Sequence, residues 1–326
     1  MEIVAADIGG THARFAIAIV EGRQVVDLDL ETTMKTADHA SLQAAWQAFG
    51  ARLGRPLPRA AAIAVACPVG VPYPDALELT NNPWIIRPAH VAAQLEVDKF
   101  SFVNDFAAVA YTVAAVGGES LVHCCGPDRP LADRGVVSVV GPGTGLGVAA
   151  LVRDAAGTRV LATEGGHSDF APLDGIEDQI LLHLRARFRR VSVERVVAGP
   201  ALVDLYETLA RIEGRAARAL DAASLWAAAL AGEDSLAAAA LDRFCLSLGA
   251  VAGDIALTQG GFGGVVIAGG IGLRLAHHLP TSGFRQRFIA KGRFEALMAD
   301  IPVRILTHRQ PGLFGAAAAF AQEHAP

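Results

Sequence analysis

Short apolar runs, separated by glycine-rich or polar turns, recur along the chain. Runs of this length are typical of buried β-strands. They predict eight strands, over residues 3–6, 13–20, 61–66, 100–103, 136–140, 148–152, 265–268 and 303–305. Between them, apolar positions follow helical spacing: one helical face carries Leu42, Trp46, Phe49 and Leu53. Gly54 then supplies a suitable C-terminal stop.

Longer helical patterns occupy much of the remaining chain. They predict helices over residues 105–116, 176–189, 200–213, 235–259 and 314–323. Because strands and helices alternate, the chain is predicted to be an α/β protein. Its 326 residues are enough for two α/β domains.

One stretch of the chain occurs twice in similar form. The segment "VAADIGGTHARFAIAIV" aligns without gaps with "VSVVGPGTGLGVAALV", so that Gly10 and Thr11 correspond to Gly143 and Thr144. Each copy predicts a strand, a glycine turn with a threonine, and a second strand. A duplication of this kind suggests two related domains that face each other across a cleft.

The two glycine turns are candidates for phosphate binding. Glycine lets backbone N–H groups approach a ligand closely, and several such groups in succession form an anion site. A single turn is more simply a tight hairpin, but two matching turns favour phosphate. A Walker P-loop and a dinucleotide fingerprint are both excluded, since a strand rather than a helix is predicted after each turn.

An acidic residue, Asp7, precedes the first turn. Its carboxylate would repel a phosphate unless a cation stood between them. Mg²⁺ prefers oxygen ligands and bridges carboxylates to nucleotide phosphates, so Asp7 is a candidate magnesium anchor. The alternative is that Asp7 caps the turn through its own backbone.

Other polar residues stand where a ligand site is expected. Asn104 and Asp105 follow an apolar run, at the strand end where open α/β sheets bind ligands, although either residue would also cap the next helix. Glu164 and His167 flank two glycines in "TEGGHSDFAP". This loop has too few nitrogen and sulfur ligands for zinc, so the pair favours hydrogen bonding to a polyhydroxyl ligand.

Three weaker candidates lie elsewhere. Asn81 in "LTNNPW" and Glu194 in "VSVERVVAGP" are individually common as a loop amide and a helix-start acid. Gly269 and Gly270 follow the apolar run "GGVVIAGG", where they permit either an adenine platform or tight packing.

Composition excludes several classes of partner. With 28 basic and 33 acidic residues the formal net charge is −5, which argues against nucleic acid or an anionic membrane as the main ligand. Asp7 interrupts the first apolar stretch, so no signal peptide is expected. The four cysteines, Cys67, Cys124, Cys125 and Cys245, lack C-x-x-C spacing and are predicted to be buried free thiols in a reducing cytoplasm.

Taken together, these motifs resemble bacterial glucokinases of the hexokinase superfamily, which have the actin-like ATPase fold. The matching stretches, in family order, are "DIGGTHAR", "AVACPV", "LTNNPW", "NDFAAVA", "GPGTGLGVA", "EGGHSDFAP", "VSVERVVAGP", "FGGVVIAGGI" and "SGFRQRFIAKGRF". The resemblance implies two actin-like, ribonuclease H-like α/β domains that flank a cleft. The expected small domain spans residues 1–112 and 307–326, and the large domain spans 113–306.

The resemblance also implies an activity, the ATP-dependent phosphorylation of glucose to glucose 6-phosphate with Mg-ATP in the interdomain cleft. It implies that Asp105 is the general base and a glucose contact. The other expected sugar contacts are Asn81, Asn104, Glu164, His167 and Glu194. The expected phosphate contacts are Asp7 (through Mg²⁺ and water), Gly9, Gly10, Thr11, Gly143, Thr144 and Gly145, with Gly269 and Gly270 on the adenosine side. Similar proteins suggest a homodimer.

Two positions depart from the family pattern. His12 stands where most relatives carry Asn, and Pro142 stands where many carry Ala; Pro142 removes one possible N–H donor from the second turn. The alternatives to a glucokinase are a kinase for another hexose and a sugar sensor without catalysis. An ATPase that acts on protein partners is disfavoured, because no residues remain to build a peptide-binding domain.

Overall fold

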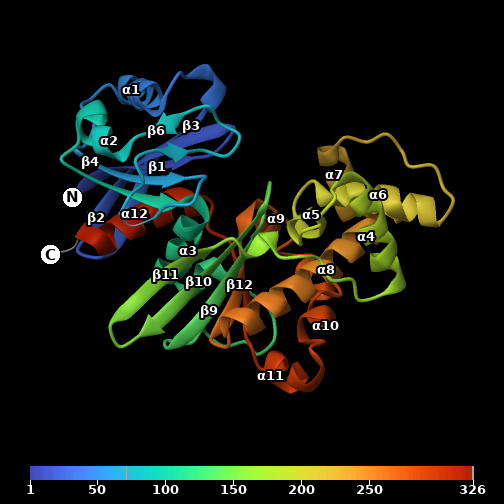
Figure 1. The fold of residues 1–326 in the computed structure, drawn as a ribbon. Helices are drawn as coiled ribbons and strands as arrows, with labels where there is room; N and C mark the ends of the chain where they lie inside the picture. Colours follow the sequence, from blue (N-terminus) through green and yellow to red (C-terminus); the bar gives the residue numbers. More distant parts are fainter. Residues whose placement is uncertain (71, 325–326) are drawn as a thin grey trace. The chain divides into compact units, whose positions relative to one another are not determined.

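The computed structural model describes residues 1–70 and 72–324. The chain divides into two compact units. The first unit comprises Met1–Gly117 and His308–Pro326, and the second comprises Gly118–Thr307 (Figure 1). The C-terminal segment therefore returns to the unit in which the chain begins.

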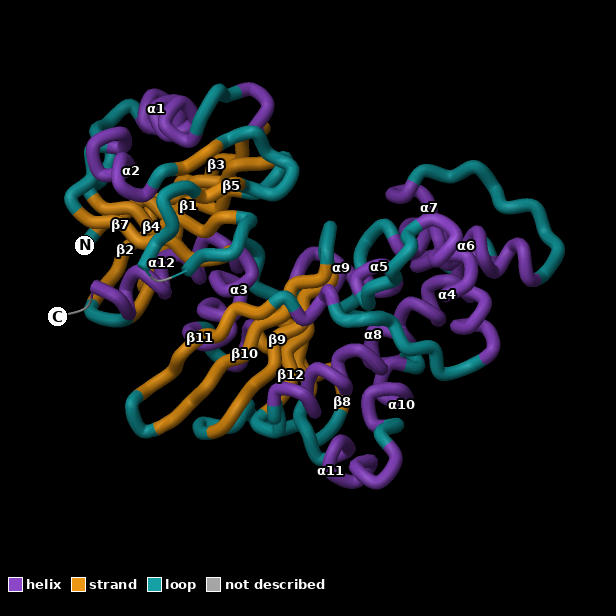
Figure 2. The backbone as a smooth tube through the Cα atoms, in the orientation of Figure 1, coloured by secondary structure: helices purple, strands orange, loops and turns teal. Residues whose placement is uncertain are grey.

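The first unit is built on a five-stranded sheet in the order β3-β2-β1-β4-β7 (Figure 2). Its strands are β1 (Glu2–Ile8), β2 (His12–Glu21), β3 (Gln24–Lys35), β4 (Ala60–Val65) and β7 (Lys99–Asn104). β1, β2 and β3 are joined as antiparallel neighbours, whereas β4 and β7 run parallel to β1. A two-residue ladder of β5 (Leu77–Glu78) and β6 (Ile85–Ile86) lies between β4 and β7 in the sequence.

Helices cover both faces of this sheet (Figure 1). α1 (Leu42–Leu53) and α2 (Pro88–Leu95) pack on one face, and α3 (Asp105–Ala115) and α12 (Pro311–His324) pack on the other. Successive side chains of a strand point to opposite faces, so Val4 joins the α1 core and Ala5 joins the α12 core. This explains why β1 is a continuous apolar run rather than an alternating one.

The second unit contains a six-stranded sheet in the order β11-β10-β9-β12-β13-β8. Its strands are β8 (Leu121–Cys125), β9 (Gly135–Pro142), β10 (Leu146–Asp154), β11 (Gly157–Thr163), β12 (Gly264–Ile267) and β13 (Val303–Leu306). Its main helices are α4 (Gly175–Arg187), α5 (Glu194–Val197), α6 (Ala201–Ile212), α7 (Ala222–Ala231), α8 (Ser235–Gln259), α9 (Gly269–Arg274), α10 (Phe284–Ile289) and α11 (Glu295–Ala299). α8 contacts α6, α7 and α10 and forms the centre of the core.

The two sheets repeat one topology, which confirms the duplicated strand–turn–strand. β9, β10 and β11 are joined as antiparallel neighbours, and β12 and β13 run parallel to β9. This arrangement matches β1, β2, β3, β4 and β7 strand for strand; β8 is an additional edge strand. Both glycine turns therefore connect the first two strands of equivalent sheets.

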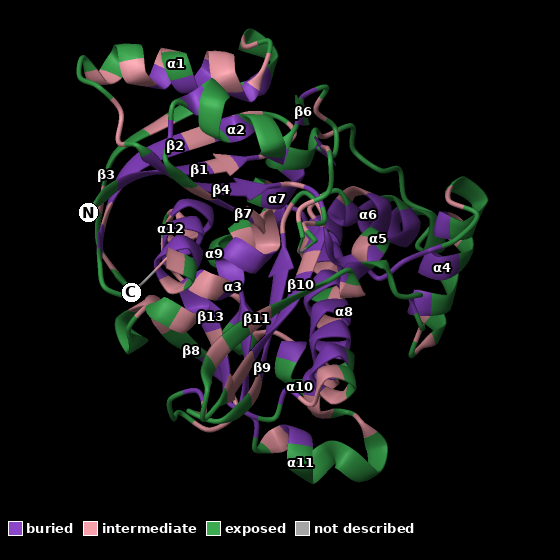
Figure 3. Cartoon of the chain, turned by 60° about the vertical axis from the view of Figure 1, so that its left-hand side comes forward, coloured by how far each residue is buried: buried purple, intermediate pink, exposed green. Residues whose placement is uncertain are grey.

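α8 is unusually long and apolar. Among the described residues it is the helix long and apolar enough to cross a membrane, but 72% of its most apolar window is buried inside the fold. Figure 3 shows the same helix as largely buried. We therefore interpret α8 as the core helix of the second unit.

The predicted strands and helices are all present, within a few residues of their expected bounds. The four cysteines are free and buried, as predicted. The elements that were not predicted are strands β3, β5, β6, β8 and β11 and helices α2, α5, α7, α9, α10 and α11. β3 and β11 are edge strands exposed along much of their length, so neither has the unbroken apolar run by which the other strands were found.

Candidate active site

The turn between β1 and β2 is held by contacts to its carbonyl groups. The Gly9 N–H donates to the His12 carbonyl at 2.9 Å. Asn82 Nδ2 donates to the Gly9 carbonyl at 3.1 Å, and Thr36 Oγ1 donates to the Gly10 carbonyl at 2.8 Å. Within residues 1–70 and 72–324, the N–H groups of Gly10 and Thr11 have no acceptor. The turn thus presents donors in the manner of an anion site.

The absence of a side chain at Gly10 brings Asn81 to this turn. A Cβ at position 10 would lie 2.9 Å from the Thr80 carbonyl oxygen and 3.2 Å from the Asn81 Cβ. Asn81 itself has a φ of 56°, a left-handed conformation that asparagine tolerates better than most residues. The structure therefore brings together two predicted site residues that are distant in sequence.

The turn between β9 and β10 has similar supports. The Gly143 N–H donates to the Gly145 carbonyl at 2.8 Å, and the Gly199 N–H donates to the Gly143 carbonyl at 2.7 Å. The N–H groups of Thr144 and Gly145 have no acceptor in the described part of the chain. Pro142 ends β9, opposite Leu146 in the ladder, and so lies beside the turn rather than among these donors.

Glu194 reaches the second turn from α5. Its Oε2 accepts the Leu146 N–H at 2.9 Å and would lie 2.5 Å from a Cβ at position 145. The short helix η3 (Gly165–His167) packs against Leu146, because a Cβ at Gly166 would be 2.2 Å from the Leu146 carbonyl oxygen. Glu194 and the η3 segment therefore meet at the start of β10.

Glu164 and His167 lie at the two ends of η3. His167 Nε2 is 4.0 Å from Glu164 Oε2, and the two side chains are 59% and 64% exposed. Both polar groups are thus open to a ligand from solvent, in contrast to a histidine fixed in a core.

Asn104 and Asp105 stand where β7 meets α3. Asn104 Oδ1 accepts the N–H groups of Phe106 and Ala107, both at 3.0 Å, so the predicted capping role is confirmed. Its Nδ2 donates to the Cys67 carbonyl and to Asp105 Oδ1, both at 3.1 Å. Asp105 Oδ1 also accepts the Phe106 N–H at 2.8 Å. The Asp105 carboxylate is therefore fixed at the first position of α3.

Asp7 is an acidic residue of the first unit whose side chain is largely covered. Its Oδ2 accepts a hydrogen bond from Arg14 Nη1 at 3.0 Å, and its side chain is 15% exposed. Burial raises the pKa of Asp7, while the Arg14 charge opposes that rise. The Asp7 carboxylate packs against Gly312, where a side chain would not fit: a Cβ at position 312 would lie 2.5 Å from Asp7 Oδ2. A carboxylate fits Mg²⁺, but Arg14 already supplies one positive charge beside Asp7, which the sequence analysis did not foresee.

Gly269 and Gly270 begin α9 in the second unit. Gly269 has a φ of 74°, and a Cβ there would meet the Pro142 carbonyl oxygen at 2.7 Å. Gly270 has no atom within 4 Å of its Cβ position among the described residues. Gly269 is thus explained by packing, whereas Gly270 leaves open space that a flat ligand can approach.

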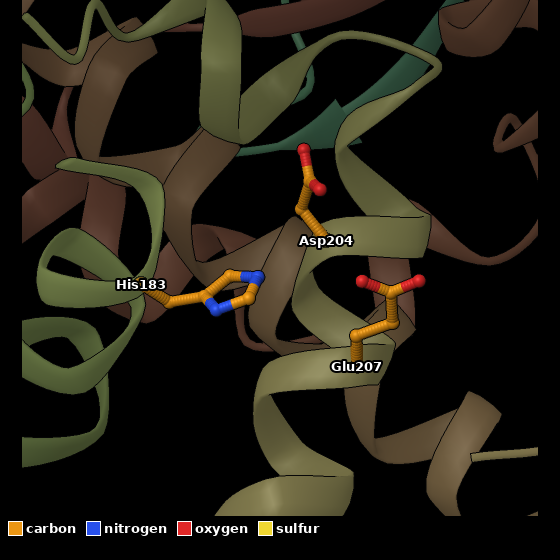
Figure 4. Close-up of side chains that lie close together, drawn as sticks. All are labelled: His183, Asp204 and Glu207. Atoms are coloured by element: carbon orange, nitrogen blue, oxygen red, sulfur yellow. The ribbon is translucent and has the colours of Figure 1, made fainter. Parts of the chain in front are cut away.

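A histidine and two acids form a separate cluster between α4 and α6 (Figure 4). The metal-binding atoms of His183, Asp204 and Glu207 lie within 4.8 Å of one another. Arg211 Nη1, however, donates to His183 Nδ1 at 2.9 Å, and Arg187 is paired with Asp204.

These arginines argue against a metal at the cluster. Arginine only donates, so the neutral His183 ring accepts at Nδ1 and carries its proton on Nε2, whereas a metal-binding histidine donates its second N–H to an acceptor. Burial and the charges of Arg211 and Arg187 lower the pKa of His183, and the same charges repel a cation. We assign this cluster to ion pairing between the two helices.

Several residues that contact the two turns or Asp7 were not predicted. They are Thr36, Asn82, Leu146 and Gly199 at the turns and Arg14 at Asp7. Asn82 had a sequence signal, because it follows Asn81 in "LTNNPW". Gly199 lies in the quoted stretch "VSVERVVAGP", whereas Thr36 lies in none of the quoted stretches.

Comparison with known proteins places the chain among sugar kinases. A family model described as Glucokinase matches residues 4–323. A glucokinase of Zymomonas mobilis is 59% identical over 324 residues, which cover 99% of both chains. The crystal structure of a glucokinase from an Antarctic psychrotroph superposes with a TM-score of 0.84 at 34% identity, covering 98% of this chain and 99% of that one.

A more distant structure shares the fold. It is a ROK family glucokinase from Streptomyces griseus in complex with glucose and AMPPNP, with a TM-score of 0.65 and 18% identity, covering 99% of this chain and all of that one. The repeated sheets and the glycine turns agree with these matches, and so does the order of motifs along the sequence. The chain belongs to the glucokinase family.

Proposed function

We propose that this chain transfers a phosphoryl group from ATP to glucose and forms glucose 6-phosphate. The observation that carries the proposal is the Asp105 carboxylate, held at the head of α3 by the Asn104 side chain and the Phe106 N–H. A primary alcohol is a weak nucleophile at neutral pH, so a positioned carboxylate must take its proton as the new bond forms. Asp105 is the residue that we propose for this step.

Phosphate binding is assigned to the two turns. The N–H groups of Gly10 and Thr11, and those of Thr144 and Gly145, have no acceptor among the described residues. Such preorganised donors stabilise the charge of a phosphoryl group in transfer. Mg²⁺, when bound, would neutralise further phosphate charge, and Asp7 would hold it through water. Gly270 offers the open space proposed for the adenosine side.

Sugar binding is assigned to residues of both units. They are Asn81, Asn104, Asp105, Glu164, His167 and Glu194. Many paired polar groups should make the site selective, because a sugar that lacks one hydroxyl leaves a partner unmatched, at a cost of about 1–3 kcal/mol.

We propose further that the two units are domains that close on the substrates, since water must be excluded to prevent ATP hydrolysis. The hinge is assigned to the two crossings between the units, near residues 111–118 and 306–312. Solution scattering with saturating glucose should give a smaller radius of gyration than scattering without it. Identical curves would contradict closure.

We also propose that the enzyme acts as a cytoplasmic homodimer. Light scattering coupled to size-exclusion chromatography tests the oligomeric state, for which a mass of twice 33.9 kDa is expected.

The decisive experiment on function is a coupled assay of ADP release across a panel of hexoses. We expect glucose to give the highest kcat/KM. A higher value for mannose, fructose or an amino sugar would identify a different hexose kinase. Binding of glucose without ADP release would identify a sugar sensor.

A further inference from the structure

Two segments that carry proposed sugar contacts are joined by a short backbone ladder. Phe170 donates its N–H to the Val191 carbonyl at 3.0 Å, and Val193 donates to the Ser168 carbonyl at 2.8 Å. Between these bonds, Asp169 and Ser192 form an antiparallel bridge. His167 ends η3, and the ladder joins the segment that follows it to the segment that precedes Glu194.

Arg190 closes the η3 end of this ladder. Its Nη2 donates to the His167 carbonyl at 2.8 Å, and its Nε lies 2.7 Å from Asp169 Oδ1. The guanidinium is planar and rigid, so two contacts fix both its direction and that of the groups it binds. The residue whose carbonyl it holds is itself a proposed sugar contact.

These contacts are too exposed to serve folding. The Arg190 and Asp169 side chains are 63% and 72% exposed, and ion pairs in such positions add little to stability. The ladder and the buried Val191 and Val193 already hold the segment in place. Arg190 instead fixes the orientation of the His167 peptide group, and so the orientation of the η3 side chains toward a ligand.

We propose that Arg190 is a positioning residue for the sugar. By holding the His167 carbonyl it keeps Glu164 and His167 in the geometry that binds hydroxyl groups. Arg190 itself does not touch the reacting atoms. This inference rests on the proposed function, because it assigns η3 to sugar binding.

The test compares steady-state kinetics of wild type, Arg190→Ala and Arg190→Lys. Loss of one charge-assisted hydrogen bond to the turn predicts that Arg190→Ala raises the glucose KM about five- to tenfold. The ATP KM and the kcat should stay within about twofold of wild type, since no transition-state contact is removed. The melting temperature should stay within a few degrees of wild type. Arg190→Lys keeps the positive charge and a single donor nitrogen, so its glucose KM should fall between those of wild type and Arg190→Ala.

Arg189→Ala is the matched control. Arg189 is the neighbouring exposed arginine, and it has no hydrogen bond or ion pair among the described residues. A glucose KM for Arg190→Ala equal to that of Arg189→Ala overturns the inference, and so does a loss confined to kcat. If Arg190→Ala does not fold, Arg190→Lys decides: a glucose KM equal to that of wild type then overturns the inference. Failure of wild type to phosphorylate glucose would refute the proposed function instead, whatever the variants do.

Discussion

The Glu194 carboxylate accepts the backbone N–H of Leu146 at 2.9 Å. Leu146 begins β10 directly after the second glycine turn, and Glu194 begins α5. The same oxygen would lie 2.5 Å from a Cβ at position 145, so the turn and the carboxylate fit each other only with glycine there. A residue proposed to bind sugar therefore rests on a turn proposed to bind phosphate.

Substitution of Glu194 should affect both substrates. In Glu194→Ala the Leu146 N–H loses its acceptor, so the turn is less well ordered. We expect the KM values for glucose and for ATP each to rise about tenfold or more, the scale of a lost hydrogen bond to a charged group. Glu194→Gln keeps an acceptor oxygen and should preserve the ATP KM while the glucose KM rises. Equal ATP KM values in wild type and Glu194→Ala would contradict the prediction that Glu194 orders the turn for ATP binding.

Substitution of Asp105 should separate chemistry from binding. Asp105→Asn keeps an oxygen for the Asn104 amide and the Phe106 N–H but takes up no proton. We expect kcat to fall by about 10²- to 10⁴-fold, with glucose affinity measured by calorimetry almost unchanged. A variant with nearly normal kcat would remove Asp105 as the base.

The packing of α12 on α3 depends on Gly315. A Cβ there would lie 1.6 Å from the Ala108 carbonyl oxygen and 2.7 Å from Thr112 Oγ1, so the two helix backbones must separate to admit it. We expect Gly315→Ala to lower the free energy of unfolding by about 1–3 kcal/mol or more. Gly175→Ala, at a position with no atom within 4 Å of the added Cβ, is the control for thermal melts. Equal melting temperatures in the two variants would contradict this account.

Sequence patterns predicted the strands that are buried on both faces, because such strands are continuous apolar runs in the sequence. β1, β4 and β9 are covered on both faces, so their apolar runs are visible without the partner elements. β3 and β11 are edge strands, and their pairing to β2 and β10 is fixed by neighbours rather than by their own hydrophobicity. The glycine turns were visible because glycine and threonine recur at matching positions.

The supports of the site were not predictable in the same way. Thr36 is 26 residues from Gly10 in the sequence, and Asn82 is 73 residues from Gly9, yet both contact the first turn. Glu194 is 48 residues from Leu146, which it contacts beside the second turn. Arg14 reaches Asp7 because the two residues are paired across β1 and β2, a register that no single strand reveals. Such contacts arise from topology, so local pattern indicates candidate site residues but not their partners.

Asp7 offers a test of the balance between burial and charge pairing. Burial is the larger influence and raises the pKa of Asp7 above 3.8, while Arg14 opposes it. In the pH range between 3.8 and the raised value, the folded chain holds more protons than the unfolded chain. Wild type therefore gains stability as pH falls through that range, whereas an amide at position 7 gains nothing.

We expect Asp7→Asn to melt at the same temperature as wild type or higher at neutral pH, where wild type buries an ionised carboxylate. That advantage should shrink as the pH is lowered through the raised pKa of Asp7, because Asp7 becomes protonated in the folded state. Activity should move in the opposite direction, with a large loss of kcat at every pH, since the amide holds neither Arg14 nor Mg²⁺ in the same way. Paired thermal melts and ADP-release assays across this range measure both effects. A variant that is less stable than wild type at neutral pH, with a gap that closes on acidification, would mean that the Arg14 pair outweighs burial.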